Sequence, residues 1–390
     1  MATVALPISE AFLSDPFPFY DRLRDAAPVC RAELPDGAPA WLVTRYAEVR
    51  ALLADPRLSV DKSNGDGSWR GFSLPPALDA NLLNMDPPDH TRIRRLVSQA
   101  FTPRRVENLR PRVQETADAL LDAVEGRGEA DLVRDYAGPL PVAVISDLLG
   151  VPVPDREDFR SWTDAMVSPP RQDRREAARA VGAIHAYLEK LLAAKRAEPT
   201  DDLLSALIAA RDDGDRLTED ELTSLAFLLL FAGYENTVHA IGTSLFTLLR
   251  TSAFPADPAG LESTIEELLR YEPPAPVILR RFATEDIEIT GAVVPRGETV
   301  LLVVGAANRD PAAFPAPGEV RPGRSGAHLT FGHGVHYCLA APLARIELEV
   351  AIGTVGRRFP GLRLAVAADE VRWRPSYRTR GLVALPVILG

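Results

Sequence analysis

Hydrophobic residues recur at three-to-four spacing along much of the chain, which is the pattern of amphipathic helices. Helices are predicted in this way over residues 104–125, 175–197, 218–250, 259–271 and 341–358. The segment 218–250 is the longest of them. Thr218 precedes Glu221 by three residues there, as a capping box at a helix start requires.

Strand patterns are fewer and shorter. The best are residues 39–45, 287–304 and 382–389, and "PRG" inside the second predicts a hairpin turn. Residues 60–90 are rich in Gly, Pro and Asp, which is typical of a long irregular segment with a functional role. No repeat or long linker divides the chain. We therefore expect one domain over 1–390, mainly α with a minor β portion.

Composition narrows the class of protein. The 390 residues are 46% hydrophobic and carry a net charge of −10, which argues against a nucleic-acid or anionic-membrane partner. The two cysteines, Cys30 and Cys338, cannot build a disulfide framework, and this favours a reducing cytoplasm. The N-terminus lacks the pattern of a signal peptide, and the apolar run 225–233 is too short to span a bilayer. A cytoplasmic protein is expected.

Cys338 lies in "TFGHGVHYCLAAPLARIELEV", residues 330–350, between a glycine-broken loop and a predicted helix. A lone cysteine is most often a small buried hydrophobe. Here Gly332 and Gly334 allow a sharp bend, and Pro342 suits the first turn of a helix. A helix N-terminus favours an anion, so we expect this thiol to ionise easily and to serve as a metal ligand.

The ligand set restricts the metal. Zinc and iron–sulfur sites need several thiolate or imidazole ligands. Cys30 is distant in sequence, and His333 and His336 lack the usual paired spacing. A single thiolate suits haem iron, because the porphyrin supplies the other four donors, and the two propionates of haem then require cations.

The segment "FGHGVHYCLA" resembles the haem-binding signature FxxGxxxCxG of the cytochrome P-450 superfamily. Three further segments resemble motifs of that family in the same order: "HTRIRR" (90–95) the HxxxR segment, "AGYENT" (232–237) the oxygen-activation motif, and "EELLR" (266–270) the ExxR motif. Each is weak alone, but the ordered set is specific, and the similarity covers nearly the whole chain. It implies the cytochrome P-450 fold, with haem b between the long central helix and the cysteine loop and helix.

The resemblance also implies roles for residues. Cys338 would bind the iron, and His90, Arg94, Arg281 and His336 would reach the haem propionates. The other implied cofactor contacts are Ala232, Gly233, Phe331 and Gly332. Glu267, Arg270 and Arg324 would form a buried charged network behind the haem, although the i,i+3 spacing of the first two also fits a surface ion pair.

The central helix carries the implied catalytic residues. Glu235 is an acid within an apolar helix, and the family uses this acid to deliver protons to dioxygen; a solvated groove residue is the alternative. Asn236 stands where the family usually has threonine, and Thr237 points about 100° further round the helix. Ala340 replaces a usual glycine after the cysteine, which we expect to affect packing rather than ligation.

The implied activity is that of a haem-thiolate monooxygenase, which inserts one oxygen atom of O₂ into an apolar small molecule by hydroxylation or epoxidation. A polyketide, terpenoid or peptide-derived secondary metabolite is the implied substrate class. Oxidative coupling and C–C cleavage are alternatives, as are a peroxide-driven peroxygenase, against which Glu235 argues, and a non-catalytic scaffold, against which Cys338 argues.

The same resemblance also implies the redox partners and the position of the substrate pocket. Electrons would come from a ferredoxin and its reductase, because the chain has no flavin or nicotinamide motif. The candidate docking patch is Arg94, Arg95, Arg104, Arg105 and Arg345, with ordinary surface charge as the alternative. The substrate pocket is expected at the 60–85 loop, the 165–185 region, Phe231, Val277, Ile278, Leu279 and Tyr377.

Overall fold

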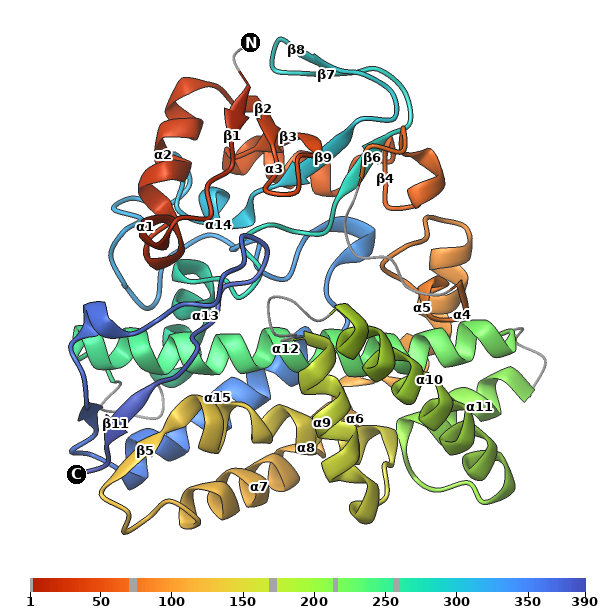
Figure 1. Ribbon diagram of the computed structural model, residues 1–390, viewed down its shortest axis with the longest axis vertical. Coiled ribbons are helices and arrows are strands. Elements are labelled where there is room, and N and C mark those ends of the chain that lie inside the picture. Colours follow the sequence, from red (N-terminus) through yellow and green to blue (C-terminus); the bar gives the residue numbers. More distant parts are fainter. Residues whose placement is uncertain (1–2, 70–75, 168–173, 213–216, 255–259) are drawn as a thin grey trace.

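A computed structural model describes residues 3–69, 76–167, 174–212, 217–254 and 260–390. Helices make up most of the molecule, and many of them lie around α12 (Glu219–Thr251). A six-stranded sheet lies at the end of the molecule away from these helices (Figure 1). The other helices are α1 (Glu10–Ser14), α2 (Phe17–Ala26), α3 (Tyr46–Leu53), α4 (Pro76–Asp79), α5 (Asp89–Ala100), α6 (Pro103–Glu107), α7 (Arg110–Asp122), α8 (Pro139–Leu149), α9 (Arg156–Val167), α10 (Arg174–Ala197), α11 (Leu203–Asp212), α13 (Leu261–Tyr271), α14 (Val304–Ala307) and α15 (Ala341–Arg358). The predicted class, mainly α with a minor β portion, is confirmed.

The strands form three sheets. The largest has the order β1-β2-β3-β9-β6-β4 and mixes parallel and antiparallel pairs; the others are β10-β11-β5 and β7-β8. The strands are β1 (Val4–Ala5), β2 (Val29–Glu33), β3 (Pro39–Val43), β4 (Leu58–Ser59), β5 (Glu129–Asp131), β6 (Arg281–Ala283), β7 (Ile287–Ile289), β8 (Ala292–Val294), β9 (Thr299–Leu302), β10 (Arg363–Leu364) and β11 (Pro386–Ile388).

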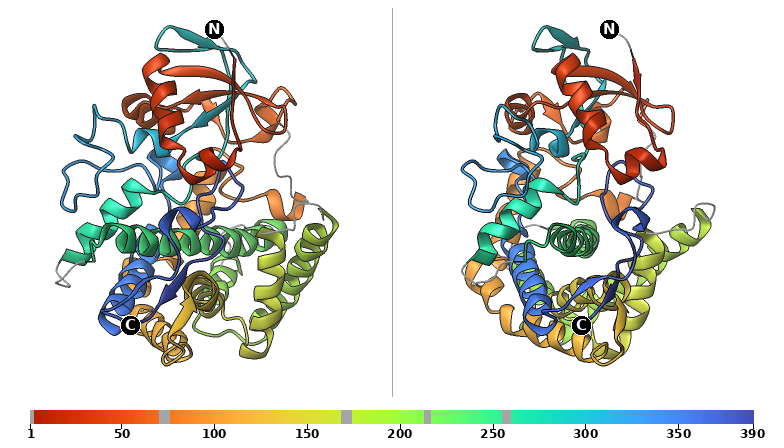
Figure 2. Two further views of the ribbon diagram at one scale, coloured as in Figure 1. Left: turned by 60° about the vertical axis from the view of Figure 1, so that its left-hand side comes forward. Right: turned by 90° about the vertical axis from the view of Figure 1, so that its left-hand side faces the viewer.

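Helix α12 is the central element. Its N-terminus has the predicted capping box, because the Thr218 hydroxyl accepts from the Glu221 N–H while the Glu221 carboxylate accepts from the Thr218 N–H. Viewed along its axis, α12 lies in the middle of the helical part (Figure 2). It is long and apolar enough to cross a bilayer, but 67% of its apolar window is buried inside the protein, as in the core helix of a folded domain.

Several predicted elements match and others differ. The helices at 175–197, 218–250 and 341–358 are α10, α12 and α15, and β3 lies within 39–45. The single helix predicted at 104–125 is wrong: α6 and α7 are separate, and Pro111 lies in the first turn of α7. The turn predicted at "PRG" is present, since Gly297 has positive φ and the Glu298 N–H donates to the Pro295 carbonyl, but it does not join two paired strands as predicted. The hairpin is β7-β8, turning at Thr290 and Gly291, which both have positive φ, and 295–298 lead from β8 into another sheet.

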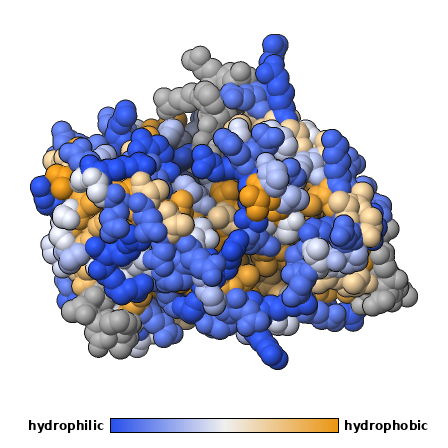
Figure 3. All heavy atoms as spheres, turned by 90° about the horizontal axis from the view of Figure 1, so that it is seen from below, coloured by the Kyte–Doolittle hydropathy of each residue, from blue (hydrophilic) through white to orange (hydrophobic). Residues whose placement is uncertain are grey.

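The hydrophobic core has separate clusters in the helical part and in the sheet part of the molecule. One large cluster joins the helices around α12, and two smaller clusters cover the two faces of the six-stranded sheet. The outer face of the helical part is mostly hydrophilic, with hydrophobic side chains scattered among the polar ones (Figure 3). The chain between the sheet and α15 contains the cysteine loop, so the fold brings that loop to the region between the sheet and the helices (Figure 1).

Candidate functional site

The loop before α15 holds Cys338 through a tight backbone arrangement. Gly332 and Gly334 both adopt positive φ, 75° and 74°, which side chains disfavour. A Cβ on Gly334 would lie 3.0 Å from the Cα of Ala54, so the loop also approaches the end of α3 closely. The Cys338 N–H donates to the Phe331 carbonyl at 2.8 Å, which folds the loop back on itself. Helix α15 then begins at Ala341, as the sequence predicts.

The Cys338 thiol does not ionise as easily as its position suggests. Burial raises its pKa, and the backbone N–H groups of Ala340 and Ala341, with the charges of Arg94 and Arg345, lower it less than burial raises it. The prediction from the helix terminus alone is therefore wrong, because it neglects desolvation. Cys338 as a whole residue is nevertheless not fully buried. A thiol of this kind loses its proton on binding a metal cation.

The other cysteine takes no part in this site. Cys30 lies on β2 in the core of the sheet, and its sulfur faces the carbonyls of Leu23 and Ala27 at 3.8 Å. Burial raises its pKa too. Among the described residues, no group of three or more His, Cys, Asp or Glu side chains could hold a metal ion. Cys338 is therefore the thiol that can serve as a metal ligand at this site.

Four nitrogen-bearing side chains converge near the cysteine loop from α5, β6 and the loop itself. The rings of His90 and His336 lie 4.3 Å apart, and Arg281 is buried. Burial, followed by the charges of Arg281, His90 and Arg94, lowers the pKa of His336 to about 3. Burial lowers the pKa of Arg281 to about 10, and burial with the Arg94 charge lowers that of His90. The four predicted propionate contacts are therefore brought together.

This cluster lacks sufficient negative charge of its own. Asp86 is the carboxylate that offsets His90 and Arg281, but it already accepts from the Ser59 hydroxyl and from the Val60 N–H. The His90 Nε2 atom is buried without a hydrogen-bond partner. Buried cations and an orphaned imidazole nitrogen need an anionic group to satisfy them. Two carboxylates beside a thiol-bound iron would do so, and the residues present therefore fit a haem.

The middle of α12 is open on one side. Residues Leu222–Leu228 and Thr237–Leu248 are buried almost throughout, whereas Ala232 is exposed and Phe231, Glu235 and Asn236 are partly accessible. Accessible surface in the middle of a core helix indicates an internal space beside it. Gly233 is partly accessible too, and a Cβ there would lie 3.2 Å from Ile145 on α8. Its small size serves helix packing.

The three predicted catalytic residues have different surroundings. Glu235 Oε1 lies 3.4 Å from Nε2 of His239, one turn further along α12. The Thr237 hydroxyl donates to the Gly233 carbonyl at 3.1 Å, so it is engaged by its own helix. Asn236 remains partly accessible at the open side. The sequence reasoning missed His239, although the spacing of four residues from Glu235 on a predicted helix was a usable signal.

The predicted charged network is buried and complete. Glu267 accepts from Arg270 Nε at 2.7 Å and Nη2 at 2.8 Å, and from Arg324 Nε at 2.8 Å. The remaining donors of Arg270 bind the carbonyls of Asn308, Pro317 and Glu319. The surface ion-pair alternative is wrong, because the Glu267 and Arg270 side chains are each 2% exposed. The network fixes the loop that leads to the cysteine.

The predicted substrate residues are only partly brought together. Ile278 and Leu279 are partly accessible, but Val277 is buried in the sheet core, against which Tyr377 also packs. Phe231 packs against the helical core and stacks on Phe227. Parts of the expected 60–85 and 165–185 regions, residues 70–75 and 168–173, lie outside the described residues.

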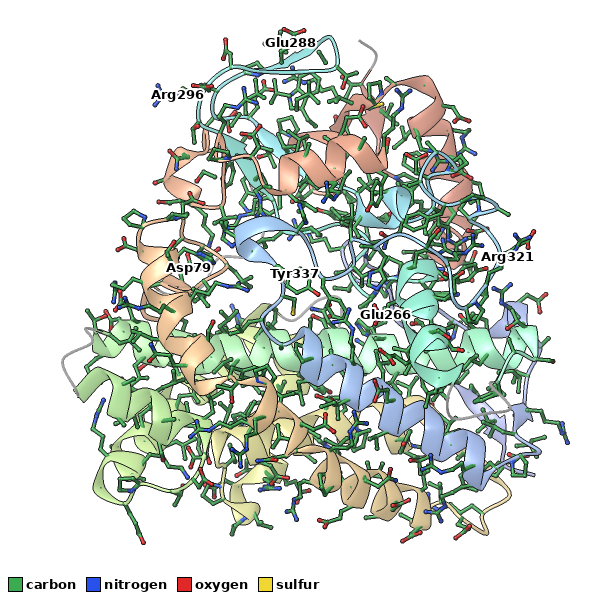
Figure 4. The ribbon with its side chains drawn as sticks, turned by 180° about the vertical axis from the view of Figure 1, so that it is seen from behind. Asp79, Glu266, Glu288, Arg296, Arg321 and Tyr337 are labelled. Carbon is green, nitrogen blue, oxygen red and sulfur yellow. The ribbon has the colours of Figure 1, made fainter. Side chains whose placement is uncertain are left out.

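A second feature was not predicted from the sequence. A pocket of about 410 Å³ lies between α13 and the cysteine loop, and no residue of α12 lines it. Within it Glu266 binds Arg345 at 2.6 and 2.9 Å and His328 at 3.2 Å. Figure 4 shows Glu266 on α13 and Tyr337 in the loop on the same side of the molecule. Arg345 is therefore neutralised by Glu266, and the predicted basic patch is weaker there.

The chain is similar in sequence to known proteins of one family. The family model described as Cytochrome P450 matches residues 62–253 and 260–365. The chain is 45% identical to cytochrome P450 monooxygenase PikC of Streptomyces venezuelae, over 97% of this chain and 92% of that one. It is 40% identical to the polyketide biosynthesis cytochrome P450 PksS of Bacillus subtilis, over 98% of both.

Solved structures give the same result. The tirandamycin C-bound P450 monooxygenase TamI superposes with a TM-score of 0.91 at 43% identity, covering 99% of this chain and 100% of that one. The matched segments include the α5, α12, α13 and cysteine-loop residues described above. On this sequence and structural agreement, the chain belongs to the cytochrome P450 family and is an oxidoreductase of the haem-iron monooxygenase type.

Proposed function

We propose that the protein holds haem b through Cys338 and oxidises an apolar secondary metabolite, with a polyketide as the first class to test. The cluster of His90, Arg94, Arg281 and His336 beside Cys338, with its unpartnered His90 Nε2, is the observation that carries the cofactor assignment. The substrate class is supported by the relative PksS, a polyketide biosynthesis cytochrome P450, and by TamI, whose structure contains tirandamycin C. Hydroxylation or epoxidation is the proposed reaction.

Each residue of the site would have a defined task. Haem, when bound, supplies the iron at which dioxygen is reduced and the substrate is oxidised. Cys338 would donate its sulfur to the iron, while the N–H groups of Ala340 and Ala341 hydrogen-bond that sulfur and limit its charge. His90 and Arg281 would orient the cofactor through its carboxylates.

Substrate orientation and proton supply fall to other parts of the chain. The accessible side of α12 at Phe231 and Ala232 would face the substrate, and Ile278 and Leu279 would bound it from the segment after α13. Glu235 would hold the proton needed for dioxygen reduction. Because the Thr237 hydroxyl is bound to its own helix, Asn236 or an ordered water would be the next polar group toward the cofactor.

Electrons would come from a ferredoxin and its reductase, in the cytoplasm. The proposed docking surface carries less net positive charge than its five arginines suggest, because Arg345 is paired with Glu266, whereas Arg94 donates to the Tyr337 carbonyl and keeps its charge. Arg95, Arg104 and Arg105 of α5 and α6 are exposed and would contribute to its basic part. Val335 and Tyr337 are exposed hydrophobic residues of the cysteine loop and would form its apolar centre.

The decisive experiment is optical. Reduced protein should give a carbon-monoxide difference band near 450 nm, and Cys338→Ser should lose it while Cys30→Ser should keep it. A panel of macrolactones and fatty acids is then screened for a Soret shift, followed by product analysis with O₂ and a ferredoxin system. An unchanged spectrum in Cys338→Ser would exclude thiolate ligation. Turnover with peroxide that exceeds the ferredoxin-driven rate would favour the peroxygenase alternative.

A further inference from the structure

His239 faces the catalytic acid from within the same helix. Its Nε2 lies 3.4 Å from Glu235 Oε1, and the two side chains are 3% and 17% exposed. This distance is slightly longer than a hydrogen bond, and the buried Nε2 has no partner of good hydrogen-bond geometry. A small rotation of the Glu235 side chain would close the contact and satisfy a nitrogen that is otherwise costly to bury.

The imidazole cannot easily move elsewhere. A Cβ on Gly381 would lie 2.1 Å from His239 Nδ1 and 2.5 Å from its Cγ and Cε1, so the backbone at 381 lies directly against the ring. Glycine is the one residue that leaves room for this approach. The Thr243 hydroxyl donates to the His239 carbonyl at 2.8 Å on the helix side. The C-terminal segment thus holds the ring toward Glu235.

We propose that His239 is a positioning residue for Glu235: it donates from Nε2–H to Oε1 and leaves the other carboxylate oxygen free for proton transfer. This rests on the proposed monooxygenase function. In the described part of the chain, His239 is the ionisable side chain that forms an ion-pair contact with Glu235. The need for such a residue is greater here, since Asn236 replaces an alcohol and Thr237 donates to Gly233.

The test distinguishes the loss of the hydrogen-bond donor at position 239 from the loss of side-chain volume there. His239→Met fills the site without a donor, whereas His239→Gln places an N–H near the position of Nε2. With spinach ferredoxin and its reductase, His239→Met should divert reducing equivalents to hydrogen peroxide and lower product per electron about tenfold. His239→Gln should retain most of the coupling. Equal coupling in wild type and both variants would overturn the proposal.

A matched control and a double-mutant cycle sharpen the result. Gln114 and Asp118 form a donor–carboxylate pair of the same spacing on α7, at 3.0 Å and outside the expected pocket, so Gln114→Met should leave coupling unchanged. Glu235→Gln combined with His239→Met should be no worse than Glu235→Gln alone. Additive losses would show that the two side chains act independently, and would contradict the proposal.

A readout independent of turnover completes the test. Histidine is labelled with ¹⁵N in the diamagnetic carbon-monoxide-bound protein, and the His239 signals are assigned by their loss in His239→Gln. Glu235→Gln should shift those signals and leave the His185 signals in place. Unshifted signals would refute the contact even if the 450 nm band is present. A missing band in the wild type would instead refute the proposed function, and the labelling is then repeated on the protein as purified.

Discussion

Replacing Glu267 with glutamine should destabilise the protein far more than the same change at Glu107. Both acids precede an arginine by three residues: Glu267 with Arg270, and Glu107 with Arg110 at 2.6 Å. The Glu267 side chain is 2% exposed and that of Glu107 is 60% exposed. Breaking a buried pair that leaves an uncompensated charge costs about 3–5 kcal/mol. An exposed pair contributes about 0–1 kcal/mol.

The contacts at Glu267 explain the size of the effect. Oε1 accepts from Arg270, from Arg324 and from the Arg321 N–H at 2.7–2.8 Å, so an amide nitrogen or a neutral oxygen there weakens several charge-assisted bonds. Unfolding entropy of roughly 2.1 cal/mol/K per residue converts about 3–5 kcal/mol into a melting-temperature loss of about 4–6 °C for a chain of this length. Glu107→Gln should shift the midpoint by about 1 °C or less.

The assay is thermal unfolding of haem-saturated protein followed by circular dichroism, with haem content measured for each variant. The pH dependence adds a second criterion. Burial would raise the pKa of Glu267, but the hydrogen bonds from Arg270, the Arg321 N–H and Arg324 lower it overall. Its stabilising effect is thus complete above the ordinary value of 4.5 and is lost as the pH falls through the folded value. Equal losses in the two variants, or a difference that grows toward acid pH, would refute the reasoning.

Three further predictions concern other parts of the site. Burial raises the pKa of Glu347 to about 8, so its carboxyl stabilises the protein below the ordinary value of 4.5 and this effect is lost as the pH rises to about 8. Glu347→Gln should therefore gain up to about 3 kcal/mol relative to wild type between pH 5 and 8 in urea titrations, and no gain would contradict the burial argument. Arg281→Met should stabilise the haem-free chain yet speed haem loss to apomyoglobin; unchanged loss would exclude a propionate contact. Gly334→Ala should reduce haem content, because its φ is 74° and Ala54 lies 3.0 Å from the new Cβ, and normal loading would disprove that constraint.

Residue spacing in the sequence correctly predicted features that lie within a single helix. The spacing of Glu267 and Arg270 places both on one face of α13, and that of His90 and Arg94 does the same on α5. The capping box of α12 was readable for the same reason. Even the error at 104–125 had a local signal, since Pro111 marks the start of a new helix.

Long-range packing decided what local patterns could not. The thiol of Cys338 stands at a helix start, but burial by distant segments moves its pKa the other way. Arg345 looks like a free surface cation in the sequence, yet Glu266 from α13 neutralises it. The approach of Gly381 to His239 joins residues far apart in the chain, and no periodicity reports such a contact.

The direction of the pKa shifts separates the cofactor site from the structural networks. Glu267 is buried and Glu266 is partly buried, yet hydrogen bonds from their partners lower the pKa of both below the ordinary value, so the chain itself satisfies their charge. At Cys338, His336 and Arg281 burial shifts each pKa toward the uncharged form, because the chain offers too little opposite charge there. Buried ionisable groups whose charge the chain does not balance reduce stability, and they are expected at functional sites. A ligand that supplies a metal cation to the thiol and carboxylates to the other two would reverse all three shifts together, and haem combines these two features in one molecule.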